Sequence, residues 1–361
     1  MKLTLDKIFT IFLLATSVSF AQNLKLFVGT YTEGENKGEG IYRFNFNSET
    51  GNLSERVLIA EAKNPSYIAL SSDKKKLYAV NEIGNYLEKE SGSLQVYDIK
   101  KNREIELDQI FSTMGQDPCH ITINKTKEKL AVSNYSGGSV SIYSLDKTGS
   151  IERLEKVINL EREPNKPNAH QAIFNQNELF ITDINNDYIY RYELVENKYR
   201  KIQKIPLKSG SGPRHLVFNK KGTSFYVVNE YDSSVCIVKK INTLYEKVKC
   251  TSTIDKDFKG ENYSGGIKLS NNGKFIYITN RGENTIATFK INKKDGRLEK
   301  IQSTSSNGDW PRSITIDPTK KFIFVTNQKS NNIAVFIIDQ ITGMLSHIYD
   351  VDIPNPTYIS F

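Results

Sequence analysis

Several features of common enzyme folds are missing from this sequence of 361 residues. No segment combines helical periodicity with helix caps at both ends, so we expect little helix. A Gly-x-Ser-x-Gly elbow, a glycine-rich phosphate loop and a His-Glu-x-x-His motif are also absent. The sequence therefore lacks the usual signatures of α/β-hydrolases, P-loop enzymes and zinc proteases.

Long hydrophobic runs are scarce, and the single one lies at Ile8–Phe20. It follows a weakly charged start, and Ser19 and Ala21 supply small residues at the −3 and −1 positions of a cleavage site, which is typical of a secretory signal peptide. A transmembrane helix needs about 20 apolar residues, more than this run has. We predict a signal peptide at residues 1–21, a single mature domain at residues 22–361 and a periplasmic or secreted location. An uncleaved membrane anchor is the alternative.

Charge is only moderately unbalanced, with a formal net charge of +8 and a sequence pI of about 9.0. The lysines are spread through turns such as Lys74–Lys76 and Lys293–Lys294, as solvated loop residues would be. RNA-binding and helix-turn-helix signatures are absent. We therefore expect no nucleic-acid partner, and the positive charge instead suits a small anionic ligand.

Cysteine is rare, with three residues in the chain. Cys236 and Cys250 flank a short polar stretch that is typical of a hairpin, and an exported protein can form disulfides. A bond between them is one possibility, and it would leave Cys119 free. Because free cysteines are usually buried and inert, we predict no thiol nucleophile.

Tyrosine and phenylalanine are abundant, with 19 and 18 residues, and they favour strands. One pattern recurs about every fifty residues: a proline or small residue, a short apolar strand, a turn, and a second strand ending in Asn or Asp. The second strands end at Asn81, Asn134, Asp183, Asn229, Asn280 and Asn327. This period indicates a four-stranded propeller blade. We expect the Asn and Asp side chains to bond the backbone of their own turns.

Two incomplete copies of the pattern stand near the ends of the chain. Leu26–Tyr31 is a second strand without a first, and Pro356–Phe361 is a first strand without a second. Pairing them would close a ring and remove exposed sheet edges. We therefore predict an all-β fold, a seven-bladed β-propeller closed by pairing of the C-terminal strand with the N-terminal blade. A β-sandwich array and a parallel β-helix are rival folds that do not repeat at this period.

Two columns of the repeat meet at one mouth of the predicted channel, because each inner strand begins beside the end of the second strand. The first column is the residue pair that opens each inner strand: Ser66-Tyr67, Cys119-His120, His170-Gln171, Arg214-His215, Gly265-Gly266 and Arg312-Ser313. The second is the residue that follows each second strand: Glu82, Tyr135, Ile184, Glu230, Arg281 and Gln328. The first column contains three of the four histidines, which is the strongest functional signal in the sequence.

These columns combine acid–base groups with anion-binding groups. Arg214, Arg281 and Arg312 offer guanidinium groups for a carboxylate or phosphate. His170 and Glu230 offer proton transfer near neutral pH, and Arg214 lies in the same blade as Glu230. A wet channel lining is the plainer alternative, but buried His and Arg are costly without partners. The histidines could suggest zinc, yet they lie on successive blades, so we predict no metal and no cofactor.

Segments along nearly the whole mature chain match one family. They are Phe27-Val28-Gly29-Thr30-Tyr31-Thr32, Gly40-Ile41-Tyr42, Asn134-Tyr135-Ser136-Gly137-Gly138, Ala169-His170-Gln171, Gly212-Pro213-Arg214-His215, Asn229-Glu230 and Asn280-Arg281-Gly282. In these segments the chain resembles the lactonase propellers, which include the propeller-type 6-phosphogluconolactonases and the carboxy-cis,cis-muconate cyclases. The chain departs from the family pattern at Asn168, where the family often has histidine.

The resemblance implies a metal-independent lactone hydrolase, a carboxylic ester hydrolase, acting on a small anionic lactone or sugar acid. It implies that His170 and Glu230 are the catalytic pair and that Arg214 and Arg281 bind the anion. The remaining expected substrate-binding residues are His120, Asn134, Tyr135, Gln171, His215 and Arg312. Because phosphogluconolactone is cytoplasmic, an exported relative is expected to act on other sugar-acid lactones.

Two other functions fit the same residues. One is a non-catalytic binding propeller at the cell envelope, which would bind a ligand without turning over a lactone. The other is a muconate-type lactonising cyclase, in which Arg214 and Arg281 would hold the carboxylates of an unsaturated diacid.

Overall fold

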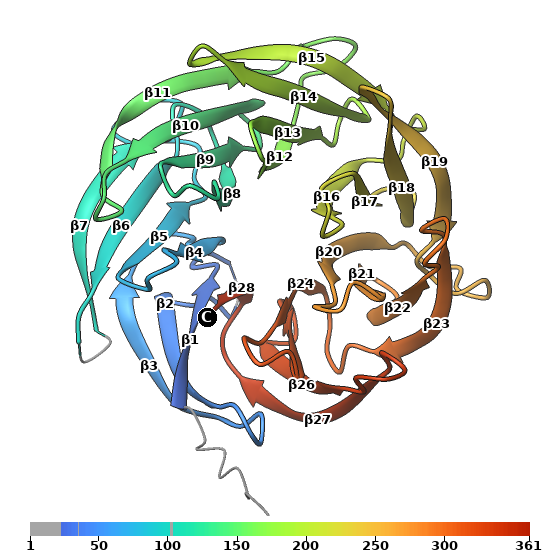
Figure 1. Ribbon diagram of the computed structural model, residues 1–361. Helices are drawn as coiled ribbons and strands as arrows, with labels where there is room; N and C mark the ends of the chain where they lie inside the picture. The colour runs from blue at the N-terminus through green and yellow to red at the C-terminus, as the bar shows by residue number, and fades with distance from the viewer. Residues whose placement is uncertain (1–22, 35, 102–103) are drawn as a thin grey trace, which may run out of the picture.

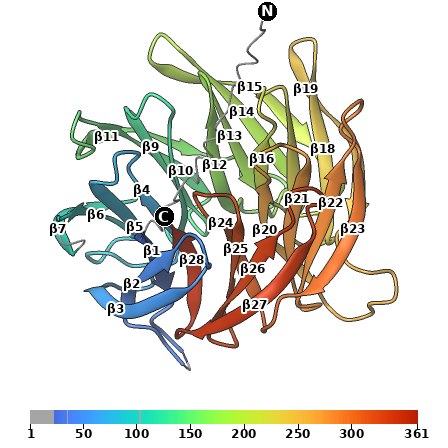
Figure 2. The same cartoon turned by 60° about the horizontal axis from the view of Figure 1, so that its bottom comes forward.

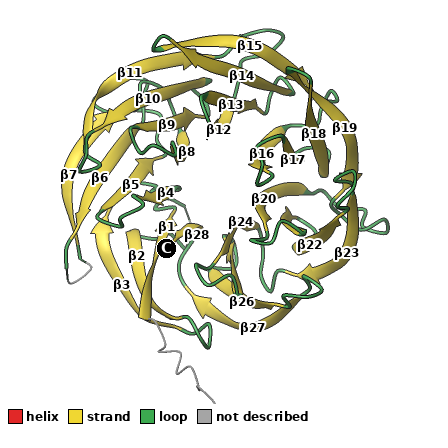
Figure 3. Ribbon diagram, in the orientation of Figure 1, coloured by secondary structure: helices red, strands yellow, loops and turns green. Residues whose placement is uncertain are grey.

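The computed structural model describes residues 23–361 except residues 35 and 102–103. Within this part of the chain, 28 strands form seven four-stranded antiparallel sheets around a central axis, without helix (Figures 1 and 3). The predicted seven-bladed β-propeller is confirmed. The predicted signal peptide at residues 1–21 lies outside the described residues. Among the residues described, none belongs to a helix of the length and apolar character needed to span a membrane.

Each blade contributes one strand to each of four layers, and blades 1 to 7 are numbered here from the N-terminus. The inner strands, in blade order, are β28 (Pro356–Ser360), β4 (Ile68–Leu70), β8 (Pro118–Ile123), β12 (Ala169–Asn175), β16 (Pro213–Phe218), β20 (Tyr263–Leu269) and β24 (Pro311–Ile316). The second strands are β1 (Asn23–Thr30), β5 (Lys76–Asn81), β9 (Lys129–Asn134), β13 (Glu178–Asp183), β17 (Ser224–Asn229), β21 (Phe275–Arg281) and β25 (Phe322–Asn327).

The two outer layers complete the blades. The third strands are β2 (Gly40–Asn47), β6 (Ser93–Ile99), β10 (Ser139–Leu145), β14 (Tyr188–Val195), β18 (Ser234–Ile241), β22 (Thr285–Ile291) and β26 (Asn332–Ile338). The outer strands are β3 (Leu53–Glu61), β7 (Ile105–Ser112), β11 (Ile151–Asn159), β15 (Lys198–Pro206), β19 (Leu244–Ser252), β23 (Leu298–Ser305) and β27 (Leu345–Asp352).

The ring is closed in blade 1, where strands from opposite ends of the chain pair. β28 runs antiparallel to β1, with Val28 opposite Ile359 and Gly29 opposite Tyr358. The red end of the chain therefore lies beside the blue β1 in both views (Figures 1 and 2). The predicted closure is confirmed, and it gives blade 1 the inner strand that its N-terminal segment lacks.

The apolar core lies between neighbouring blades. Every residue of β5, β13 and β25 is buried, because blades on either side cover both faces of these second strands. Between blades 7 and 1, the ring of Phe46 packs edge-on against Phe324 with the ring centroids 5.3 Å apart. Burying a phenylalanine side chain stabilises the fold by roughly 1.5–3 kcal/mol. The second strands are therefore nearly continuous apolar runs, whereas the outer strands are largely exposed.

The amide side chains that end the second strands tie neighbouring blades together. Four of these five asparagines donate a hydrogen bond to a carbonyl in the connection that arrives from the preceding blade, whereas Asn229 donates to Ser234 in its own blade. The pairs are Asn81 with Lys63, Asn134 with Thr113, Asn280 with Thr253 and Asn327 with Ser306, at 2.7–3.1 Å. The expected structural role of this column holds for these residues, but the partner differs. The amides bond the incoming connection, because that segment passes beside the strand end on its way to the channel.

The two cysteines of blade 5 form a disulfide. Cys236 in β18 lies directly opposite Cys250 in β19, and their sulfur atoms are bonded. Cys119, at the start of the inner strand β8, is free and buried. Burial raises the pKa of the Cys119 thiol, which keeps it protonated and unreactive.

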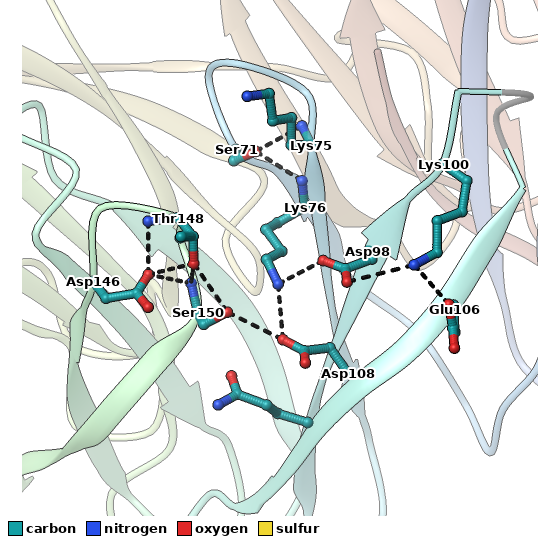
Figure 4. Close-up of polar contacts among 12 residues, drawn as sticks. Ser71, Lys75, Lys76, Asp98, Lys100, Glu106, Asp108, Asp146, Thr148 and Ser150 are labelled. Atoms are coloured by element: carbon teal, nitrogen blue, oxygen red, sulfur yellow. Dashed lines mark hydrogen bonds and ion pairs between the residues drawn. The ribbon is translucent and has the colours of Figure 1, made fainter.

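A buried lysine joins three strands at the edge of the blades away from the second-strand ends (Figure 4). The Nζ atom of Lys76 lies 2.6 Å from Asp98 and 2.7 Å from Asp108, and its side chain is 7% exposed. Asp108 also accepts a hydrogen bond of 3.1 Å from Ser150 in the next blade. Burial alone would lower the pKa of Lys76, but the hydrogen bonds with Asp108 and Asp98 raise it. The cluster therefore holds a charged lysine where blades 2 and 3 meet.

Neutralising both aspartates together is expected to destabilise the fold. The double variant Asp98→Asn/Asp108→Asn leaves the Lys76 ammonium without a carboxylate, which should lower the free energy of unfolding by about 3 kcal/mol. Asp98→Asn alone should cost about 1 kcal/mol, because Asp108 remains. Urea denaturation at pH 7 measures both. Adding Lys76→Met to the double variant should recover most of the loss, and a double variant as stable as the native chain would contradict this account.

Candidate active site at the channel rim

A β-bulge near the start of four inner strands selects which side chain turns to the channel rim. The pairing with the second strand skips one residue in each: Cys119 in β8, His170 in β12, Arg214 in β16 and Arg312 in β24. A bulge leaves its extra residue unpaired and re-aims the side chain. The residues that follow re-enter the pairing: His120, Gln171, His215 and Ser313. The first column therefore splits into two tiers. The bulged residues form the rim tier, and the residues that follow them form the lower tier.

Threonine hydroxyls from the second strands stabilise two of these irregular turns and the irregular turn of β20. Thr182 Oγ1 accepts a hydrogen bond of 3.0 Å from the backbone N–H of Gln171, the residue after the bulge. Thr279 and Thr326 do the same for Gly266 and Ser313, at 2.8 and 3.2 Å. The hydroxyl replaces the ladder bond that the bulge removes, so the backbone donor stays satisfied. A threonine stands just before the Asn or Asp in β13, β21 and β25, whereas β9 and β17 have Ser133 and Val228 there, so threonine marks only some of the bulged blades.

Glu230 lies between two buried arginines. Its Oε2 atom is 3.0 Å from Arg214 Nε and 3.0 Å from Arg281 Nη2. Arg214 also donates to the carbonyl of Gly265, and Arg281 donates to that of Tyr263, each at 3.0 Å. Burial lowers the pKa of both guanidinium groups, and the charge of Glu230 opposes the shift. The expected proximity of Arg214 and Glu230 is confirmed, and both arginines are fixed in orientation.

A second acid–arginine group faces the rim from blades 1, 2 and 7. The Tyr31 hydroxyl donates to Glu82 Oε1 at 2.8 Å and accepts from Arg312 Nη2 at 2.6 Å. Arg312 Nη2 lies 3.8 Å from Glu82 Oε2. Burial raises the pKa of Tyr31, so its hydroxyl stays protonated. Glu82 belongs to the second sequence column but was given no role, and Tyr31 was in neither column, although it follows the end of a second strand as Glu230 does.

His170 is neutral and close to the arginines. Its ring packs edge-on against Tyr135, with the centroids 5.7 Å apart, and against His215 at 4.8 Å. Burial lowers the pKa of His170 well below its usual value, and the charges of Arg214 and Arg312 lower it further. Its Nδ1 atom is buried without a hydrogen-bond partner among the described residues. A neutral imidazole with an open nitrogen is suited to accept a proton.

The lower tier brings together three of the expected substrate-binding residues. His120 Nε2 lies 3.3 Å from Gln171 Nε2, and the His120 ring is 5.8 Å from that of His215. Gln171 Oε1 accepts the backbone N–H of Leu216 at 2.7 Å. His215 Nδ1 lies 2.8 Å from Arg214 Nη1, which links this tier to the rim. These three side chains pack against one another below the rim tier.

Asn134 and Tyr135 occupy different environments although they are neighbours in sequence. Asn134 is fully buried, and its amide bonds the carbonyl of Thr113 and the hydroxyls of Ser139 and Ser141. Asn134 thus joins the connection from blade 2 to strand β10 of blade 3. Tyr135 packs against His170 at the rim, and burial raises the pKa of its hydroxyl.

The two ion-pair groups at the rim together carry more positive than negative charge. Arg214, Arg281 and Arg312 face the two carboxylates of Glu82 and Glu230, which leaves one positive charge. Guanidinium groups in fixed positions are suited to a carboxylate or to an oxyanion that develops during a reaction. In the part of the chain that the structure describes, three or more His, Cys, Asp or Glu side chains nowhere gather as a metal site.

A family model described as "Lactonase, 7-bladed beta-propeller" matches residues 25–361. Among curated proteins, a 6-phosphogluconolactonase of Formosa agariphila is 33% identical over 311 residues, covering 81% of this chain and 86% of that protein. A 6-phosphogluconolactonase of Bacillus subtilis is 29% identical over 304 residues, covering 81% and 85%. Similarity to both relatives extends over most of the chain.

Solved structures give the same result. A putative 6-phosphogluconolactonase from Bacteroides fragilis superposes with a TM-score of 0.82 and 28% identity, covering 94% of this chain and 97% of that one. A periplasmic gluconolactonase from Pseudomonas aeruginosa superposes with a TM-score of 0.84 and 26% identity, covering 93% and 98%. Relatives bearing lactonase names thus share the fold over its full ring.

Proposed function

Because the chain belongs to the family of seven-bladed β-propeller lactonases, we propose that its channel rim hydrolyses sugar-acid lactones without a metal ion. The observation that carries the proposal is the neutral His170 beside two arginines that share one carboxylate oxygen of Glu230. A lactonase needs a base for water and positive groups for the carbonyl oxygen. The rim offers both within one cluster.

In the proposed reaction, His170 takes a proton from water while the water oxygen attacks the lactone carbonyl carbon. The carbonyl oxygen becomes an oxyanion, which Arg214 and Arg281 stabilise. The intermediate collapses as the bond from carbon to ring oxygen breaks, and the imidazolium returns its proton to the leaving oxygen. The product is a hydroxy acid, which ionises in water. Glu230 holds both guanidinium groups in place and limits the excess positive charge.

The choice of substrate class rests on the rim charge and on the relatives. The single excess positive charge favours a substrate or product with one negative charge. The relatives carry the names 6-phosphogluconolactonase and gluconolactonase, and one of them is periplasmic. We propose an aldonic or related sugar-acid lactone outside the cytoplasm as the substrate. Tyr135 and Arg312 line the rim where such a molecule would bind.

A panel of lactones tests the proposal. Purified residues 22–361 are expected to hydrolyse sugar-acid lactones in a proton-release assay, with the same rate in the presence of a chelator. Turnover of muconate-type diacids alone would favour the cyclase, and saturable lactone binding without turnover would favour a binding propeller. Activity that a chelator abolishes would overturn the metal-free mechanism.

The pH dependence of the reaction should reflect the depressed pKa of His170. The base acts only when it is unprotonated, so kcat/KM should rise with pH through this pKa and then stay level. Burial and the charge of Arg214 hold the pKa of His170 well below 6.5. The value of kcat/KM should therefore stay constant from pH 8 to below pH 6.5. Initial rates between pH 4 and pH 8, corrected for spontaneous hydrolysis, measure this. A half-maximal rate at pH 6.5 would mean that the titrating base is an exposed imidazole.

A further inference from the structure

A belt of touching side chains crosses the channel below the rim. Tyr67 stacks on Tyr358 with the ring centroids 3.9 Å apart, and its hydroxyl donates to that of Tyr358 at 3.0 Å. On its other side, the Tyr67 ring is 4.5 Å from His120, which contacts Gln171. These contacts join side chains of blades 1 to 4 at one level of the channel, below the rim arginines.

A cavity of about 200 Å³ lies against this belt. Tyr67, His120, Gln171, His215, Lys268 and Tyr358 supply its polar lining, and Thr122 and Ser313 add hydroxyl groups. No aspartate or glutamate is among the described residues that line it. Most of these polar groups can donate hydrogen bonds. A ligand in the cavity would therefore meet several hydrogen-bond donors and, among the described lining residues, no carboxylate.

Lys268 gives the cavity a positive charge. Its Nζ atom lies 3.4 Å from the Tyr358 hydroxyl, and among the described residues it takes part in no ion pair. The ammonium also lies 5.7 Å from the centre of the Tyr358 ring. A half-buried ammonium without a carboxylate is costly, and a bound anion would remove that cost.

Two of the residues that line the cavity are histidines with buried ring nitrogen atoms. His120 Nδ1 and His215 Nε2 are buried without hydrogen-bond partners among the described residues, and His120 is 4% exposed. Burial lowers the pKa of His120 to about 3, and the charges of Lys268 and Arg214 act in the same direction. These neutral rings can each donate one N–H to an acceptor.

We propose that the channel below the rim is a second binding site, for a small oxyanion such as phosphate, held by Lys268 with His120, His215 and the Tyr67–Tyr358 pair. Such an ion accepts hydrogen bonds from these groups and neutralises Lys268, for which the described lining offers no carboxylate. The site goes beyond lactone hydrolysis because it is built around Lys268, which the proposed reaction does not use, although His215 in its lining contacts Arg214 at 2.8 Å. Free phosphate and the carboxylate of a sugar acid share the required chemistry.

Phosphate titration followed by calorimetry and by NMR of ¹⁵N-labelled histidine tests the proposal. With only four histidines, each imidazole is a separate reporter, and His347 on the outer strand β27 is the internal control. Phosphate should bind saturably and shift the His120 and His215 signals, and the His120 pKa should rise. Lys268→Met should weaken binding at least tenfold, whereas Lys290→Met, at an exposed lysine of the same blade, should bind as the native chain does.

The rim arginines also attract anions, so their contribution is separated by Arg281→Gln. Persistence of the His120 shifts in Arg281→Gln supports the channel site, and their loss would assign the anion to the rim instead. Undiminished binding by Lys268→Met, or no saturable binding at millimolar phosphate, would also overturn the proposal. Displacement of phosphate by acetate would extend the site to carboxylates. Lactonase activity is measured in a separate assay, so the failure of one proposal does not affect the test of the other.

Discussion

Replacing His170 by glutamine is expected to lower kcat for lactone hydrolysis by about 10²–10⁴-fold, the usual contribution of a positioned general base. Glutamine has a similar size and cannot take up a proton at neutral pH, so the substrate pocket should survive. KM should change little, because the imidazole contributes to the transition state more than to binding. Steady-state kinetics on the best lactone of the panel measure both constants.

Two variants make this expectation specific. His347→Gln removes the surface histidine that pairs with Asp350 at 3.0 Å, and it should keep the native rate. His170→Ala should recover part of its activity when free imidazole is added, which a purely structural role of His170 would not allow. A His170→Gln protein with near-native kcat and a native melting curve would rule out His170 as the base.

Removing the charge of Glu230 is expected to affect stability and activity together. In Glu230→Gln, Arg214 and Arg281 lose the oxygen that each contacts at 3.0 Å, while their side chains remain 3% and 6% exposed. Breaking a buried ion pair in this way should cost about 3–5 kcal/mol of unfolding free energy. The freed guanidinium groups would no longer be fixed for the oxyanion, so kcat should fall about 10²–10³-fold. Urea denaturation and steady-state kinetics measure the two effects.

A matched set of variants separates charge from orientation. Glu246→Gln, at an exposed position of the same blade, should leave both quantities unchanged. Glu230→Gln combined with Arg281→Gln restores the charge balance, so stability should recover while activity stays low. If the double variant regained activity as well, Glu230 would matter only for the net charge of the rim, and its proposed orienting role would be wrong.

The fold could be predicted from the sequence because each position of the repeat has the same structural role in every blade. The apolar second strands ending in Asn or Asp, such as Leu77–Asn81, reflect burial between two blades and a hydrogen bond to the incoming connection. The incomplete copies at Leu26–Tyr31 and Pro356–Phe361 predicted the closure, because neither could form a blade alone. The free Cys119 and the Cys236–Cys250 bond were left open by spacing and needed the strand register.

The site was only partly accessible from sequence. Strand alternation does not reveal which residue of His170-Gln171 or Cys119-His120 is bulged, so the first column appeared as one tier. Asn134 shares a family motif with Tyr135, but its burial and its hydrogen bonds to Thr113 and Ser141 arise only when the blade is assembled. Tyr31 was missed because blade 1 is split between the chain ends, which hid the equivalence of Thr30-Tyr31 to Asn229-Glu230.

The rim can be completed only after the C-terminal end of the chain has been synthesised, because strand β28 pairs with β1 to close the ring. The Arg312–Tyr31 hydrogen bond joins residues 281 positions apart, and both neighbouring blades are held in place by β28 beside β1. A nascent chain that has not yet released residues 356–360 therefore lacks the inner strand under Tyr31 and cannot hold a finished rim. By contrast, the point in the ring at which the chain begins and ends does not affect the contacts of the rim. A circular permutant opened at another blade junction, with the original ends linked, would keep every rim contact.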